Sequence, residues 1–229
     1  MSSLGEDNIE LLVDRLEAVY GPPQHDHPSD PLDELVCCIL SQHTTDATSF
    51  PTFDRLKELC PTWEQVIALG PERLSQVIRK AGLANQKSRS IIGCLVEIYS
   101  RNGEFHLENL RDLSLVDARK WLESLPGVGP KTASIVLCFS FGMNAIPVDT
   151  HVYRVCWRLG IIPEGIGEKR AHDRLLGLVP GGLAFRFHVA LIQHGRQCCK
   201  APLPMCEKCV VSDLCLWKLQ NRAQRRVSS

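Results

Sequence analysis

Apolar residues recur along this chain at helical spacing, and no segment keeps the alternation of apolar and polar residues that marks a β-strand. In residues 6–20, apolar positions fall among acidic ones, and Gly21-Pro22-Pro23 ends the segment. The pattern predicts an all-α protein. The predicted helices cover residues 6–20, 31–43, 86–100, 114–124, 131–141, 150–159, 168–178 and 183–194, with short helices on either side of Gly70-Pro71 and a capping box at Thr62–Gln65.

Two of these helices carry candidate chemistry at their first turns. Helix 131–141 is apolar on nearly every side, so we expect it to run through the middle of a helical domain, and its only charge is Lys131. The helix dipole, and any partial burial, would favour the neutral, nucleophilic form of that amine. Helix 150–159 is amphipathic and begins directly after Asp149, which we expect to be its N-cap.

The segment before Lys131 is a tight turn, Gly127-Val128-Gly129-Pro130, between two predicted helices. The two glycines allow positive φ and close approach by another molecule, and Pro130 suits a first helical position. Amides of the turn and of the helix start lack intrahelical acceptors, so they can face an anion. Taken singly, the turn, the lysine and the cap are ordinary structural features. Together they predict a phosphate-binding backbone associated with an amine and a carboxylate.

Composition and charge narrow the class of protein. The chain has 229 residues, enough for one large or two small domains, and no apolar run approaches the length of a membrane span. Its first thirty residues hold seven acids and one arginine, which fits neither a signal nor a transit peptide. Net charge is zero, but residues 183–229 hold eight Lys or Arg against two acids. One basic face on a neutral protein is therefore expected.

Cysteine is abundant, with eleven residues in the chain. An odd count without a secretion signal indicates a reducing compartment. The spacing Cys199-x6-Cys206-x2-Cys209-x5-Cys215 predicts a metal site, and its single short pair fits a [4Fe–4S] cluster better than zinc, with Cys198 outside the pattern as a free thiol. Six further cysteines lie in apolar contexts and are interpreted as small core residues: Cys37, Cys38, Cys60, Cys94, Cys138 and Cys156.

Basic residues surround the cysteine-rich segment, and a loop held by a cluster would present them as a rigid phosphate-binding surface. Lys208 lies inside the segment and is the DNA-contacting candidate of this group. The other members are Arg196, Lys200, Lys218, Arg222, Arg225 and Arg226.

LPGVGPKTA followed by VDTHVYRVC resembles the helix-hairpin-helix and the Gly/Pro-Asp loop of the endonuclease III family of DNA glycosylases. SQHTTD at 41–46 resembles that family's LSxQxTD segment, and the spacing of the four cysteines is the same as in its cluster. The resemblance covers nearly the whole chain. It implies a six-helix barrel domain at 24–143 and an iron–sulfur domain formed by 1–23 and 144–229.

The resemblance also implies roles for single residues. The family's lysine at the position of Lys131 attacks the deoxyribose C1′, and its aspartate at the position of Asp149 stabilises positive charge on the sugar. His43 stands where the family has a Gln that fills the gap left by an extruded nucleotide, and Leu83 matches the apolar wedge. DNA contacts are further implied for Gly127, Val128, Gly129, Thr132 and His151.

The resemblance implies a bifunctional DNA glycosylase and AP lyase of base excision repair that removes oxidised pyrimidines such as thymine glycol. The expected partner is double-stranded DNA with damaged bases or abasic sites, bound by a monomer without a membrane. The expected location is an intracellular reducing compartment, which in a bacterium or archaeon is the cytoplasm around the nucleoid. One alternative is a monofunctional mismatch or adenine glycosylase, although those relatives lack the hairpin lysine and the adenine enzymes use a Glu where Cys38 stands. Another is a non-catalytic iron–sulfur protein that binds DNA or senses redox state.

Overall fold

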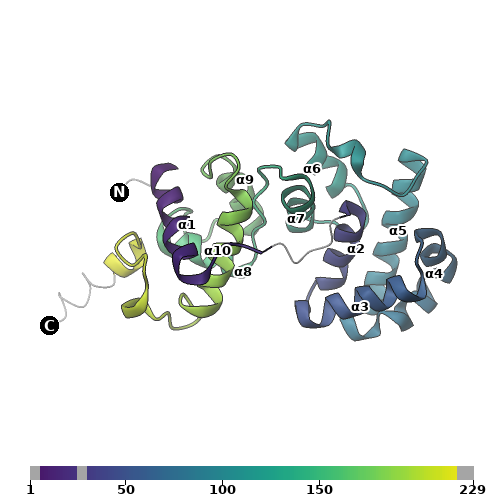
Figure 1. The fold of residues 1–229 in the computed structure, drawn as a ribbon, viewed down its shortest axis with the longest axis horizontal. Helices are drawn as coiled ribbons and strands as arrows, with labels where there is room; N and C mark the ends of the chain where they lie inside the picture. The colour runs from purple at the N-terminus through teal and green to yellow at the C-terminus, as the bar shows by residue number, and fades with distance from the viewer. Residues whose placement is uncertain (1–5, 25–29, 221–229) are drawn as a thin grey trace. The chain divides into compact units, whose positions relative to one another are not determined.

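The computed structural model describes residues 6–24 and 30–220 of the chain. Every regular element in these residues is a helix, which confirms the all-α prediction (Figure 1). The α-helices are α1 (Glu6–Tyr20), α2 (Pro31–Ser41), α3 (Asp46–Leu59), α4 (Trp63–Val77), α5 (Ala84–Asn102), α6 (Leu115–Glu123), α7 (Pro130–Phe141), α8 (Thr150–Leu159), α9 (Glu168–Leu176) and α10 (Ala184–Gln197). Three short 3-10 helices are η1 (Arg79–Ala81), η2 (Glu108–Leu110) and η3 (Cys206–Lys208).

The chain folds as two compact units, one of residues 26–141 and one of residues 1–25 with 142–229. These boundaries lie two residues from the expected ones at 24 and 143. The assignment of the units as a barrel domain and a cluster domain stays a prediction. No helix in the described ranges is long and apolar enough to cross a membrane.

In the unit of residues 26–141, α7 packs against α2 and α6, and α2 also contacts α3 and α5. Nine of the eleven residues of α2 are buried, and α7 buries residues on several sides, among them Ala133, Val136 and Leu137. Full burial of these apolar side chains drives the unit's formation. The six cysteines interpreted as core residues are all buried, which confirms that interpretation.

Backbone conformation explains two of the predicted helix boundaries in this unit that are wrong. Helix α2 ends at Ser41 and not at His43, because Gln42 has ψ 125° and His43 has φ 54°. Helix α5 begins at Ala84 and not at Gln86, because Leu83, with φ 47°, is already its N-cap. The predicted break at Gly70-Pro71 is present as a non-helical Gly70 inside α4.

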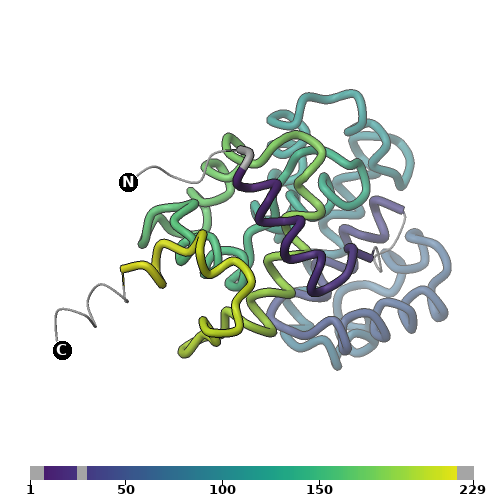
Figure 2. The backbone as a smooth tube through the Cα atoms, turned by 60° about the vertical axis from the view of Figure 1, so that its left-hand side comes forward, coloured from purple at the N-terminus to yellow at the C-terminus, as the bar shows by residue number. Residues whose placement is uncertain are grey.

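The second unit joins the two ends of the sequence. Helix α1 lies against α10, and α10 packs against α8 (Figure 2). Ion pairs add to the contact of α1 with α10, because Arg186 on α10 bonds Glu17 at 2.6 Å and Asp14 at 2.8 Å. Arg15 on α1 also bonds Asp213, in the segment after α10, at 2.8 Å. The apolar face of α1 is fully buried, so α1 is part of this unit's core.

Candidate active site and metal centre

The hairpin between α6 and α7 is built on one obligatory glycine. Gly127 has φ +76°, and a Cβ there would collide with the Ser90 hydroxyl. Gly129, in contrast, does not lie at positive φ, so the expectation of two such glycines is correct only for Gly127. Val128 is 7% exposed and its amide donates to the Leu125 carbonyl at 3.2 Å. Its side chain therefore anchors the hairpin in the core and does not face outward.

Lys131 is the second residue of α7 and is exposed. The partial burial that the sequence allowed for this amine is therefore not observed. The buried thiol of Cys38 donates to Glu34 Oε1 at 3.0 Å. Burial and the Glu34 charge raise the pKa of Cys38, while the nearby charge of Lys131 lowers it.

Gln42, which sequence reasoning missed, ties the loop after α2 to the hairpin. Its Nε2 donates to the Gly127 carbonyl at 3.1 Å and to Thr132 Oγ1 at 3.4 Å. The side chain of Thr132 is buried, so this residue can offer DNA its amide but not its side chain. The only sequence signal was a polar residue directly after a buried helix.

The two predicted gap-filling residues share an unusual backbone. His43 and Leu83 are both exposed, and they are the only non-glycine residues at positive φ in the part of the chain that the structure describes. Leu83 is 53% exposed. An apolar side chain held outward in a left-handed turn needs support from its surroundings.

Asp149 caps α8 as expected. It is half-buried, has an extended backbone, and its Oδ1 accepts the Val152 amide at 2.7 Å. This bond gives an acceptor to one of the backbone amides that have no partner within the first turn of the helix, and it orients the carboxylate there. Asp149 belongs to the unit that holds the four candidate ligand cysteines, whereas Lys131 belongs to the other unit.

His151 and Arg154 connect the start of α8 to the cysteine-rich loop. His151 is half-buried, and its Nδ1 lies 3.1 Å from Arg154 Nη2. Arg154 donates from Nε to the Cys199 carbonyl at 3.0 Å and from Nη2 to the Gly195 carbonyl at 2.9 Å. Sequence reasoning did not single out Arg154, because both of its acceptors are backbone atoms distant in sequence.

The four cysteines predicted as metal ligands, Cys199, Cys206, Cys209 and Cys215, line one small cavity. Buried Arg158 donates to the Cys199 sulfur at 3.4 Å and to the Lys200 carbonyl at 2.9 Å. Such donors orient a thiolate ligand and its loop.

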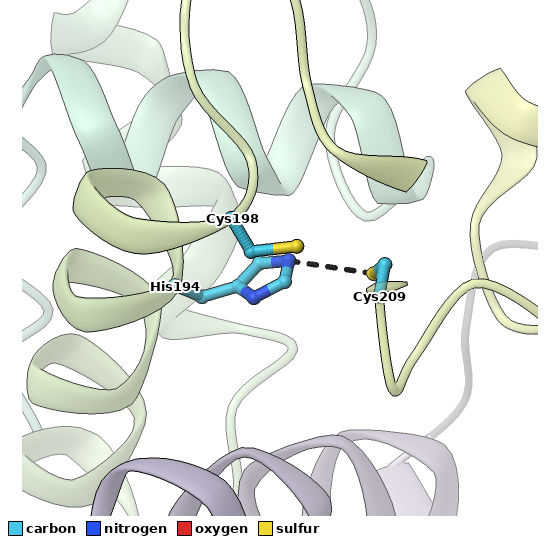
Figure 3. A group of neighbouring side chains, drawn as sticks. All are labelled: His194, Cys198 and Cys209. Carbon is cyan, nitrogen blue, oxygen red and sulfur yellow. Dashed lines mark hydrogen bonds between the residues drawn. The ribbon is translucent and has the colours of Figure 1, made fainter. Parts of the chain in front are cut away.

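His194 and Cys198 also border this cavity, and both could bind a metal (Figure 3). His194 Nε2 lies 3.7 Å from Cys209 Sγ, and ligand atoms of His194, Cys198 and Cys209 all lie within 4.8 Å of one another. Cys198, which the spacing left outside the ligand pattern, is thus close to it. Burial lowers the pKa of His194 to about 4 and raises the pKa of Cys209 to about 12. A neutral imidazole and several thiols around one cavity fit a thiophilic metal, whose charge would offset the cost of ionising the thiols.

The basic residues near this cavity separate into two groups. Lys208 on η3 and Lys200 are exposed, as a phosphate-binding surface requires. Lys218 does not belong to that surface, because it is 7% exposed and its Nζ donates inward to the Cys206 carbonyl at 2.8 Å. The tail residues Arg222, Arg225 and Arg226 lie outside the described residues.

Comparison with known proteins identifies the relatives of this chain. Residues 36–180 match the profile of HhH-GPD superfamily base excision DNA repair proteins. The endonuclease III of Buchnera aphidicola subsp. Baizongia pistaciae is 37% identical over 187 residues, 82% of each chain. That of Escherichia coli K12 is 36% identical over 211 residues, 92% of this chain and 95% of the relative.

Solved structures agree with the sequence relatives. A non-covalent endonuclease III–DNA complex superposes with a TM-score of 0.80 at 31% identity, covering 96% of this chain and 99% of that one. A trapped endonuclease III–DNA covalent intermediate gives 0.81 at 32% identity with the same coverage. The chain therefore belongs to the HhH-GPD superfamily of base excision DNA repair proteins and, within it, to the endonuclease III family.

Proposed function

We propose that this protein is a bifunctional DNA glycosylase and AP lyase that acts on double-stranded DNA in base excision repair. The observation that carries the proposal is the exposed amine of Lys131 at the start of α7, directly after the Gly127 hairpin, in a chain of the endonuclease III family. A relative has been solved as a trapped covalent intermediate with DNA, and an amine is the kind of nucleophile that forms such a bond.

Lys131 is the proposed nucleophile. Its neutral amine attacks C1′ of the damaged nucleotide, the bond from C1′ to the base breaks, and the base leaves with a proton. The sugar ring opens to a Schiff base between C1′ and the amine. Loss of a proton from C2′ then breaks the bond from C3′ to its oxygen, which releases the 3′ strand, and water hydrolyses the Schiff base.

Asp149 is the proposed charge-stabilising partner of Lys131. Its carboxylate stabilises positive charge on the sugar as the base departs and accepts the proton that the attacking amine loses. The N-cap bond to Val152 supports this role, because it holds the carboxylate in one orientation.

DNA binding is assigned to two groups of residues. The amides of Gly127, Gly129 and Thr132, at the hairpin and the start of α7, face phosphate. Val128, whose amide bonds the Leu125 carbonyl, holds the hairpin in place for this contact. His43 and Leu83 occupy the gap left when the damaged nucleotide leaves the stack, and Lys208 contacts phosphate from the cysteine-rich loop. For His151 we propose a place at the border of the site, held there by Arg154.

The proposed cofactor is a [4Fe–4S] cluster bound by Cys199, Cys206, Cys209 and Cys215. Four thiols of suitable spacing around one cavity support it, and zinc is the alternative. The cluster would fix the loop that presents Lys200 and Lys208. Iron and sulfide analysis of the purified protein distinguishes the two metals.

Several finer properties follow from the family and are part of the same proposal. The substrates are oxidised pyrimidines of the thymine glycol type. The unit of residues 26–141 is the barrel domain and the other unit is the cluster domain. The protein acts as a monomer in the reducing, nucleoid-containing cytoplasm, where free thiols persist.

Borohydride trapping on duplex DNA with an abasic site tests the lyase chemistry. We expect wild-type protein to form a covalent complex and Lys131→Ala to form none, since only an amine yields a reducible Schiff base. Lys120→Ala on the preceding helix is the matched control, because Lys120 is also exposed. Absence of trapping by a wild-type protein that binds DNA would leave a monofunctional glycosylase or a non-catalytic binding protein.

A further inference from the structure

Lys87 on α5 is a buried cation that the proposed chemistry does not use. It is 2% exposed, and its Nζ donates to the Leu40 carbonyl at 2.6 Å and to the Ala81 carbonyl at 2.7 Å. Within the described residues it makes no ion pair with a carboxylate. Burial lowers the pKa of Lys87. Burying an amine on neutral acceptors alone is costly, so a specific role is indicated.

The two acceptor carbonyls lie at the ends of two helical segments. Leu40 is in the last turn of α2, and Ala81 is the last residue of η1. Carbonyls at helix ends have no partner within their own helix, and a cation there is favoured by the helix dipole. One ammonium group therefore links the end of α2 to the end of η1.

These two ends lead directly into the two exposed left-handed residues of this unit. Leu40 precedes His43 by three residues, and Ala81 precedes Leu83 by two. The backbone amide of Lys87 also donates to the Leu83 carbonyl at 3.0 Å. Lys87 thus holds the backbone on both sides of Leu83 and the helix end that leads to His43. Strained residues persist where surrounding contacts determine their conformation, and Lys87 supplies such contacts at both sites.

We propose that Lys87 is a positioning residue for nucleotide extrusion, whose ammonium group sets the spacing between the turns that carry His43 and Leu83. The proposal rests on the proposed function, in which both side chains enter the gap left by one extruded nucleotide. Filling one gap from two loops requires that both loops be in register before the nucleotide leaves the stack. Gln42, which directly precedes His43, links the same turn to the hairpin through its hydrogen bond to the Gly127 carbonyl.

Lys87→Met tests this proposal, because methionine keeps an unbranched stem and removes the donors. Lys80→Met is the matched control, since Lys80 is exposed on η1. Each protein is assayed for base excision from duplex DNA, which needs extrusion, and for cleavage at an abasic site in single-stranded DNA, which does not. We expect Lys87→Met to slow duplex excision roughly tenfold to a hundredfold, with single-strand cleavage at the wild-type rate.

A second assay measures gap filling directly and requires neither base excision nor strand cleavage. Duplex DNA carrying a tetrahydrofuran abasic analogue beside 2-aminopurine reports gap filling through the fluorescence of the unstacked base. Wild type and Lys80→Met should change this fluorescence, and Lys87→Met should not do so at saturating protein. If Lys87→Met does not fold, Lys87→Gln, which keeps one amide donor, replaces it in both assays.

The outcomes separate the two proposals. Wild-type fluorescence for the Lys87 variant, or an equal loss of rate on duplex and single-stranded substrates, would overturn the positioning role and leave the proposed function standing. A wild-type protein without trapping or excision would instead overturn the proposed function. The fluorescence assay would still decide the role of Lys87, because it depends only on binding.

Discussion

At the scale of single residues, side chains that bond to backbone carbonyls organise the surface proposed to bind DNA. Gln42 and Lys87 both lie in the unit of residues 26–141, and each joins segments distant in sequence. Such bonds set the relative positions of loops without contributing a reacting atom. Their removal should therefore change stability and positioning in proportion to the bonds lost.

Gln42→Ala should lower the free energy of unfolding by about 1–2 kcal/mol, because it removes two hydrogen bonds from a half-buried amide. Urea unfolding of the variant measures this effect. Gln86→Ala serves as control, since Gln86 is exposed at the start of α5. Equal stability of the two variants would mean that the bonds to Gly127 and Thr132 contribute nothing.

Lys87 should also give stability a specific pH dependence. Its folded pKa is lowered from 10.5 by burial, so over the range between the two pKa values the unfolded chain keeps a proton that the folded protein releases. The quantity to follow is the free energy of unfolding of wild type minus that of Lys87→Met. This difference should be constant at pH values below the folded pKa of Lys87 and should rise with pH from there to about 10.5. Urea titrations at stepped pH measure it, and a difference that falls with pH contradicts the assignment.

At the scale of elements, α8 begins at a candidate catalytic carboxylate and is fastened to the candidate metal loop. Arg154 makes that connection through the carbonyls of Cys199 and Gly195. Arg158, one turn later, bonds the same loop from inside the protein. The helix therefore couples the order of the loop to the orientation of Asp149.

Arg154→Met should loosen the loop without removing a metal ligand. We expect faster loss of the proposed cluster to a chelator, by roughly tenfold, with an unchanged initial iron content, because outer bonds of this kind commonly contribute that much. Arg170→Met on α9 is the control, since Arg170 is exposed in the same unit. An unchanged rate of metal loss in Arg154→Met would contradict the coupling.

At the scale of the whole molecule, the two ends of the chain form one unit. Leu16 on α1 is fully buried in it, whereas Leu11 on the same helix is 40% exposed. Leu16→Ala should therefore destabilise this unit by about 2–5 kcal/mol, and Leu11→Ala much less. Loss of the proposed cluster's absorbance should shift to a lower denaturant concentration for Leu16→Ala only. A shared shift would mean that burial of α1 is not what stabilises the unit.

The sequence allowed the prediction of features determined locally. Helix α8 and its Asp149 cap occur as predicted, because a polar cap and an amphipathic stripe are readable from neighbouring residues. The end of α2 was misplaced, since nothing local marks His43 as left-handed. Long-range bonds to carbonyls were not foreseen: those of Lys87 and Arg154 went unnoticed, and Lys218 was expected at the surface. Proximity of His194 and Cys198 to the other cysteines likewise needs the tertiary fold.

The division of the chain into residues 26–141 and the two flanking segments has a consequence for biosynthesis. The inner unit is continuous, so it can fold on the ribosome as soon as it emerges. Helix α1 must wait for α10, which at about 5–20 residues per second is a delay of roughly 10–35 s during which its apolar face has no partner. A nascent-chain chaperone would find its target on α1 in that interval. Because the cysteine-rich loop emerges after α10, metal insertion would be a late step in the maturation of the protein.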